Sequence, residues 1–138
     1  PIENTLRLSE IIKNAIPAAA RNGGHHPAKR SFQAIRIEVN SELSIIEPTL
    51  KAITGHLNAG GRIAVITFHS LEDRAAKRAF ADLSKGCTCP PSYPVCVCGN
   101  KPKLSLCNKK PILPSEQELA ENHRSHSAKL RVAERTEF

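Results

Sequence analysis

The sequence predicts an α/β fold, and three features of residues 43–86 carry that prediction. An amphipathic helix comes first, because apolar residues recur at steps of three and four: Leu43, Ile46, Leu50, Ile53 and Leu57. Residues 62–68 then form a nearly continuous apolar run, which is typical of a parallel-sheet strand that helices cover on both faces. A second helix follows near Ser70, and the order helix, strand, helix indicates an α/β architecture.

The start of the chain predicts a helix of its own. Apolar residues recur at helical spacing from Leu8 to Ile16, either Asn4 or Thr5 is expected to cap the helix, and Pro17 is expected to end it.

A connector and a basic helix come next. The run Gly23-Gly24-His25-His26 is reminiscent of a phosphate or cofactor loop, but such loops lead from a strand into a helix. This run leaves a helix, so we interpret it as a plain connector. In the helix that follows, Phe32, Ile35 and Val39 form an apolar face, opposite three basic residues: Lys29, Arg30 and Arg36.

The boundaries of the central elements follow from proline, glycine and capping residues. Pro48 is expected to kink the helix of residues 43–57 or to mark a new start, and Gly60-Gly61 to end it through a left-handed cap. Ser70 is the expected N-cap of the next helix, with Glu72 and Asp73 in its positive first turn. We expect that helix to stop before Gly86 and to bury one face: Leu71, Ala75, Ala79, Phe80 and Leu83.

A loop rich in proline and cysteine spans residues 84–115. It contains a predicted short strand at 104–107, and a capping box at Ser115 predicts a brief helix. Residues 130–135 alternate as a half-buried strand does. The expected result is three strands with helices, preceded by helices that need not belong to the same domain.

Charge and composition narrow the function. The net charge of +7 suits a polyanionic partner such as nucleic acid, although a solvated basic surface explains it equally well. Five aromatic residues and no tryptophan argue against a platform that stacks bases. No apolar run is long enough to cross a membrane, and the lack of any methionine indicates a piece of a longer polypeptide.

Three stretches together resemble one enzyme family. They are residues 26–43 (HPAKRSFQAIRIEVNSEL), 60–74 (GGRIAVITFHSLEDR) and 127–135 (SAKLRVAER). In this order and spacing they resemble the MraW-type methyltransferases, which use S-adenosylmethionine to methylate N4 of a cytidine in the RNA of the small ribosomal subunit. One stretch departs from the family pattern: Asn122 to His126 replaces an expected proline and arginine, which would make an RNA contact at His126 weaker and pH-dependent.

The resemblance implies a fold and a division of the chain. The family has a class I (Rossmann-like) methyltransferase sheet with an inserted helical domain. Residues 1–34 would then be the end of the inserted domain, and residues 35–138 the C-terminal half of the sheet. It also implies a cytoplasmic protein whose partners are ribosomal RNA and the small subunit, with no membrane.

The methyl-donor site is expected to be missing. In this fold the donor sits on a glycine-rich turn after a strand, and no such strand–turn–helix unit stands in this sequence. The resemblance places the family's donor contacts before Pro1, so no cofactor-binding residue is assigned here. We therefore expect the isolated chain to be inactive.

Six residues are candidate contacts for the RNA substrate. His69 and Ser70 follow the carboxyl end of a predicted strand, where ligands gather in open α/β sheets, and His69 is the one candidate for a catalytic role. Arg74 is expected either to hold a phosphate or, preferably, to form a structural ion pair, with Asp73 supporting the helix dipole. The basic residues Lys29, Arg30 and Arg36 would bind phosphates or form a solvated face.

Four cysteines are candidate metal ligands. Cys87, Cys89, Cys96 and Cys98 match a structural zinc site in number, although spacers of two to four residues are more usual. Free thiols are the alternative, and Cys107 stands apart.

Two further functions compete with the enzyme. One is a free-standing RNA-binding or zinc-ribbon module, against which the buried strand argues. The other is an assembly role, in which an uncovered sheet edge would form a homodimer.

Overall fold

The computed structural model describes residues 1–21 and 26–138, which fall into two compact units, Pro1–Glu42 and Leu43–Phe138. The Gly23-Gly24-His25 part of the proposed connector lies outside the described residues. The domain boundary expected at residue 34 falls inside a helix, Lys29–Val39, whereas the compact units divide eight residues later.

The first unit is helical. It consists of α1 (Thr5–Ala15), a short 3-10 helix η1 (Ala18–Arg21) and α2 (Lys29–Val39). The capping residue of α1 is Asn4, whose side-chain oxygen accepts a hydrogen bond from the amide of Arg7 at 2.9 Å. The predicted helix at the start of the chain and the basic helix after it are both confirmed.

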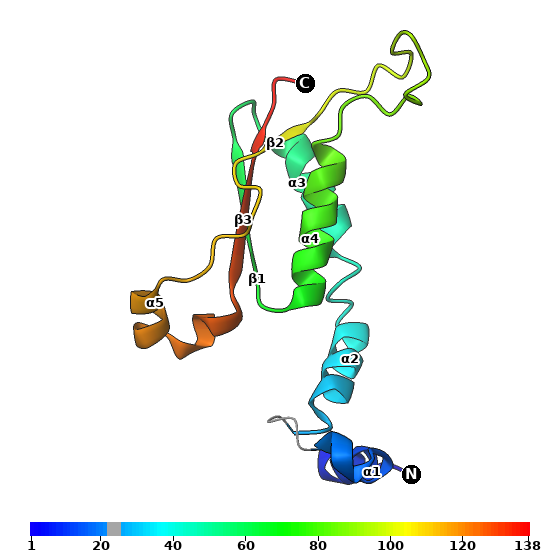
Figure 1. The fold of residues 1–138 in the computed structure, drawn as a ribbon, viewed down its shortest axis with the longest axis vertical. Helices are drawn as coiled ribbons and strands as arrows, with labels where there is room; N and C mark the ends of the chain where they lie inside the picture. The colour runs from blue at the N-terminus through cyan, green and yellow to red at the C-terminus, as the bar shows by residue number, and fades with distance from the viewer. Residues whose placement is uncertain (22–25) are drawn as a thin grey trace. The chain divides into compact units, whose positions relative to one another are not determined.

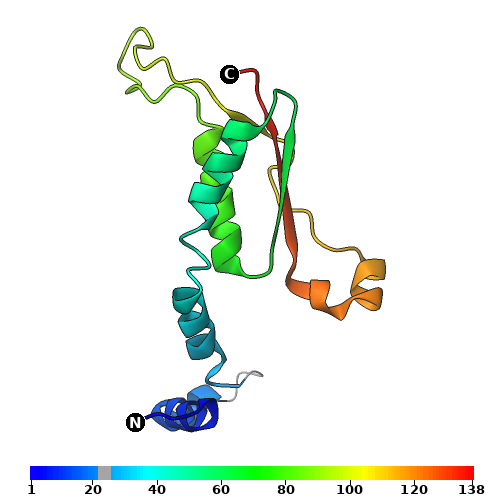
Figure 2. The same cartoon turned by 180° about the vertical axis from the view of Figure 1, so that it is seen from behind.

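The second unit contains a three-stranded sheet with helices. Its elements are α3 (Ile46–His56), β1 (Arg62–Thr67), α4 (Ser70–Leu83), β2 (Leu104–Leu106), α5 (Glu116–Glu121), η2 (His123–Ser127) and β3 (Lys129–Arg135). The strand order is β1-β3-β2, and β3 pairs antiparallel with both neighbours. Figures 1 and 2 show α3 and α4 side by side, with α4 along one face of the sheet. The α/β class and the three predicted strands are confirmed.

The apolar run of residues 62–68 forms a strand, β1, but the burial of its side chains differs from the prediction. Within the described residues β1 pairs only with β3, and it is an edge strand of an antiparallel sheet. Its side chains alternate, so Ile63 and Thr67 are buried whereas Ile66 is 60% exposed on the opposite face. The expectation of a strand buried on both faces is therefore wrong for this part of the structure, because α4 covers one face alone.

A single apolar cluster joins α3, α4 and the sheet. Phe80 of α4 is its largest fully buried side chain, and small residues at Ala76 and Ala79 let the helix approach its neighbours closely. The cluster comprises Leu50, Ile63, Ala76, Ala79, Phe80, Leu83, Leu104 and Ala133. Two residues expected on the inward face of α4 lie elsewhere, since Leu71 is 40% exposed and Ala76 is buried in place of Ala75.

Of the two roles expected for Pro48, the new helix start is the one observed, whereas the end of α3 differs from the prediction. The helix begins at Ile46, so Pro48 lies in the first turn, where the amide that proline lacks has no intrahelical acceptor. The helix ends at His56, before the two glycines. Gly60 has a φ of +80° and belongs to the turn into β1, where its amide donates to the carbonyl oxygen of Arg135 at 2.9 Å.

The C-terminal elements agree with the sequence. Ser115 caps α5 by accepting a hydrogen bond from the amide of Glu118, and β3 covers the predicted final strand. None of the helices in the described residues has the length and apolar character needed to cross a membrane.

Candidate functional site

The turn from β1 into α4 is built around His69. Its backbone is extended (φ −141°, ψ 164°), and its Nδ1 accepts a hydrogen bond from the amide of Glu72 at 3.4 Å. His69 is therefore the N-cap of α4, one residue before the expected Ser70. Ser70 is exposed in the first turn, because the imidazole already occupies the position that its hydroxyl was expected to take.

Glu72 completes this capping box from the other side. One of its carboxylate oxygens accepts hydrogen bonds from the amides of Phe68 at 2.8 Å and His69 at 3.1 Å. Its second oxygen lies 3.3 Å from Nε2 of His69, whose side chain is only 13% exposed. Both ring nitrogens of His69 therefore lie close to Glu72, at the carboxyl end of β1.

Asp73 forms the principal ion pair of the second unit. Its two carboxylate oxygens accept hydrogen bonds from Nε and Nη2 of Arg131, at 2.7 and 3.2 Å, and Lys129 lies 3.8 Å away. The hydrogen bonds from Arg131 hold the pKa of the Asp73 carboxyl below its usual value, and the charges of Arg131 and Lys129 act in the same direction. This pair joins the first turn of α4 to β3.

In this helical turn the ion pair is therefore formed by Asp73, whereas it was expected at the next residue, Arg74. Arg74 is exposed, and its guanidinium makes no ion pair within the part of the chain that the structure describes. Residues 72 and 131 were missed as site residues by sequence reasoning. Arg131 lies on the same face of β3 as the buried Ala133, and a buried arginine needs a negatively charged partner. This alternation in the sequence is the signal that could have shown the need for such a partner.

The basic residues of α2 are exposed but differ in their bonding. Arg36 is paired with Glu42, at 2.8 Å between Nε and Oε1 and 3.2 Å between Nη2 and Oε2. Lys29 and Arg30 line a surface hollow of about 470 Å³ with Ile16 and His26. The two residues at the start of α2 are the ones whose charges face solvent beside a concave surface.

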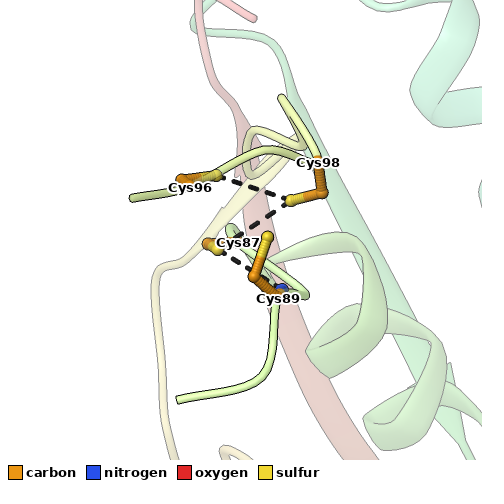
Figure 3. A group of neighbouring side chains, drawn as sticks. All are labelled: Cys87, Cys89, Cys96 and Cys98. Carbon is orange, nitrogen blue, oxygen red and sulfur yellow. Dashed lines mark hydrogen bonds between the residues drawn. The ribbon is translucent and has the colours of Figure 1, made fainter. Parts of the chain in front are cut away.

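Four thiols converge in the segment between α4 and β2, residues 84–103, which we call the cysteine loop. The Sγ atoms of Cys87, Cys89, Cys96 and Cys98 all lie within 4.8 Å of one another. Figure 3 shows the four side chains gathered in the loop. Cys98 is central, with its sulfur 3.6 Å from that of Cys96 and 3.8 Å from that of Cys87. All of them are free thiols, as is the exposed Cys107 outside the loop. The structure thus brings together all four residues that the sequence singled out.

Hydrogen bonds shift the pKa values of two of these thiols in opposite directions. The amides of Thr88 and Asn100 donate to Cys98 Sγ and lower the pKa of its thiol to about 5. The amide of Cys89 acts to lower the pKa of Cys87, but hydrogen bonds with the thiols of Cys96, Cys89 and Cys98 outweigh it and raise that pKa to about 12. Of these two thiols, Cys98 is therefore the one that loses its proton more readily.

The comparison with known proteins decides the family. The MraW methylase family matches residues 1–136. The chain belongs to this family. Proteins named ribosomal RNA small subunit methyltransferase H are 60% identical in a Paenibacillus species, 58% in Brevibacillus brevis and 56% in Heliobacterium modesticaldum, each over 135 residues. These alignments cover 98% of this chain and 43% of each relative, so the MraW family member described here spans less than half the length of those relatives.

Proposed function

We propose that this chain is the C-terminal part of an S-adenosylmethionine-dependent methyltransferase that modifies N4 of a cytidine in small-subunit ribosomal RNA. The observation that carries the proposal is the family match over residues 1–136, together with relatives named as small-subunit ribosomal RNA methyltransferases. The net charge of +7 suits an RNA substrate.

The sheet supports a place in a larger class I fold. β1 is an edge strand among the described residues, and Ile66 lies 60% exposed opposite Leu130 on the face away from α4. A nearly continuous apolar run is typical of a strand that lies inside a sheet with helices on both faces. We therefore infer that other parts of the whole protein pair with the free edge of β1 and cover Ile66.

The described residues do not fit the methyl donor. A donor site in this fold needs a strand, a glycine-rich turn and a helix in succession. The one strand in the described residues that leads directly into a helix, β1, is followed by His69-Ser70, whose turn is closed by side-chain caps. We infer that the donor site lies in other parts of the whole enzyme and that this chain contributes to the RNA side.

The residues proposed to contact the RNA are His69, Ser70 and Arg74 in the second unit and Lys29 and Arg30 in the first. In open α/β sheets the carboxyl ends of strands border the ligand crevice, and His69 stands at that end of β1. Lys29 and Arg30 would supply salt-dependent affinity for phosphates, whereas Arg36 is already neutralised by Glu42.

A methylation assay with the full-length protein tests this proposal. Labelled S-adenosylmethionine and small ribosomal subunits that lack the modification are expected to give one labelled cytidine, methylated at N4. Methylation of another base or of another RNA would overturn the assignment. Calorimetry with this chain alone is expected to show no micromolar binding of S-adenosylmethionine, and such binding would contradict the inferred division of the sites.

The role of His69 needs a variant that preserves its cap. His69→Asn keeps an N-cap acceptor for the Glu72 amide but removes the imidazole. In the full-length enzyme we expect His69→Asn to lower turnover about 10-fold or more, because the imidazole borders the substrate and the loss of one hydrogen bond of about 1.4 kcal/mol is a tenfold change in rate. The exposed His56→Asn is the matched control and is expected to be unaffected. Normal turnover in His69→Asn would leave the histidine as a capping residue only.

A further inference from the structure

The cysteine loop lacks the usual source of stability. No residue between 84 and 103 is buried, and its apolar side chains Tyr93, Val95 and Val97 are 53%, 70% and 73% exposed. Burial of apolar surface therefore contributes little to the loop's conformation. Four sulfurs nevertheless meet within 4.8 Å, which requires the chain to fold back over eleven positions.

The spacing of the sulfurs fits a tetrahedral metal ion. Zinc–thiolate bonds of about 2.3 Å in a tetrahedron place the sulfurs about 3.8 Å apart. The sulfur of Cys98 lies 3.6 Å from that of Cys96 and 3.8 Å from that of Cys87. Disulfide sulfurs lie about 2.0 Å apart, and none of these pairs approaches that distance.

Amide hydrogen bonds surround the sulfurs as they do in metal–thiolate sites. Thr88 and Asn100 donate to Cys98, at 3.3 and 3.5 Å, and Val97 donates to Cys89 at 3.4 Å. The amide of Cys89 donates to Cys87 at 3.4 Å. Such bonds orient sulfur ligands and offset their negative charge.

The chemistry of the loop selects the kind of ion. Residues 84–103 contain no Asp, Glu or His, so the four sulfurs are the sole strong ligands that the loop offers. Thiolates favour soft or borderline ions such as Zn²⁺ over Mg²⁺ or Ca²⁺, which take oxygen ligands. Lys85, Lys101 and Lys103 flank the cluster in the sequence and give the loop positive charge to offset four thiolates.

The two ends of the loop are already fixed by the folded unit. The side-chain amide of Asn100 donates to the carbonyl oxygens of Lys85 and Gly86, at 3.2 and 2.6 Å. The amide of Lys103 donates to the carbonyl oxygen of Leu83 at 2.8 Å. The four thiols therefore lie in a loop whose two ends are joined to each other and to the folded unit by hydrogen bonds.

We propose that Cys87, Cys89, Cys96 and Cys98 bind one Zn²⁺ ion as a structural tetrathiolate site that holds the cysteine loop in its folded form. Four protein ligands fill the tetrahedron and leave no position for water or substrate, so the ion has no part in methyl transfer. The zinc proposal does not depend on the proposed RNA substrate, because its observations all come from the cysteine loop.

Metal analysis of the chain purified under reducing conditions tests the proposal. We expect about one zinc ion per chain after dialysis, since structural tetrathiolate sites bind zinc tightly. Each of the four Cys→Ser variants is expected to lose most of that zinc in competition with a chelator. Cys107→Ser is the matched control and is expected to retain it, because Cys107 lies outside the cluster.

Two further readouts remain informative if a variant folds poorly. Replacement of zinc by Co²⁺ in the unaltered chain is expected to give the visible bands of a tetrahedral ion with thiolate-to-cobalt charge transfer. Trypsin is expected to cut after Lys85 faster once the metal is removed, while cleavage after Lys101 is blocked by Pro102. A chain without bound metal, an octahedral cobalt spectrum, or equal zinc loss in Cys107→Ser would overturn the site.

Discussion

The α4 core and the cysteine loop are neighbours in the chain, yet they are organised by different interactions. Around α4, eight buried apolar residues pack from two helices and three strands. In the loop that follows Leu83 no residue is buried, and the groups that converge are sulfurs and amides. The difference indicates that contiguous segments of one compact unit can depend on separate sources of stability.

The largest expected effect on stability is that of Phe80→Ala, which removes the largest buried side chain of the core. Phe80 is 2% exposed, and truncating a buried phenylalanine costs about 3–5 kcal/mol of unfolding free energy. Phe68→Ala is the matched control, since that ring is 55% exposed and its loss is expected to cost about 0.5 kcal/mol. Urea unfolding followed by circular dichroism measures both. Equal costs for the two variants would contradict the core described here.

The second effect concerns the ion pair that ties α4 to β3. The side chain of Asp73 is only 14% exposed. Arg131→Met removes the two hydrogen bonds that its carboxylate accepts from Arg131. We expect a loss of about 2–3 kcal/mol in urea unfolding. Arg62→Met removes the exposed pair with Glu134 and is expected to cost about 0–1 kcal/mol. A smaller loss for Arg131→Met than for Arg62→Met would show that the pair near α4 is not the stabilising one.

The elements with strong periodicity were predictable from the sequence. α1, α2, α4 and the three strands follow from apolar spacing and capping residues. The exact cap of α4 was not predictable, because His69 takes a place that statistics give to Ser70. Burial of β1 on both faces is not seen within the described residues, because an apolar run does not reveal which elements cover each face.

The site was predictable in its parts but not in its pairings. Cys87, Cys89, Cys96 and Cys98 could be found from residue type and spacing alone, and the structure joins them. The pairing of Asp73 with Arg131 spans 58 positions and depends on the register of β3 against β1. Alternation in β3 leaves open which set of side chains faces α4, so no local pattern identifies that partner.

A third effect is the acid sensitivity of the same ion pair. The folded-state pKa of Asp73 is lowered, so the unfolded chain binds the proton more readily than the folded one. The stabilisation from this residue is therefore complete above its unfolded-state pKa and is lost as the pH falls through its folded-state pKa. Asp73→Asn is expected to flatten this part of the stability profile, measured by urea unfolding between about pH 7 and pH 3. A slope unchanged by Asp73→Asn would assign the acid sensitivity to other carboxylates.

The smallest effect on global stability is expected from removing the metal. The four ligands lie within twelve consecutive positions, so the unfolded chain retains much of its ability to bind zinc and the linkage to unfolding is weak. We expect chelation to change the unfolding free energy of the α4 core by about 1 kcal/mol or less, while cleavage after Lys85 becomes faster. Unfolding of the core monitored with and without chelator measures the first effect, and timed proteolysis measures the second. A chelator that unfolded α4 together with the loop would show that the two regions are a single cooperative unit, with the metal rather than Phe80 at its centre.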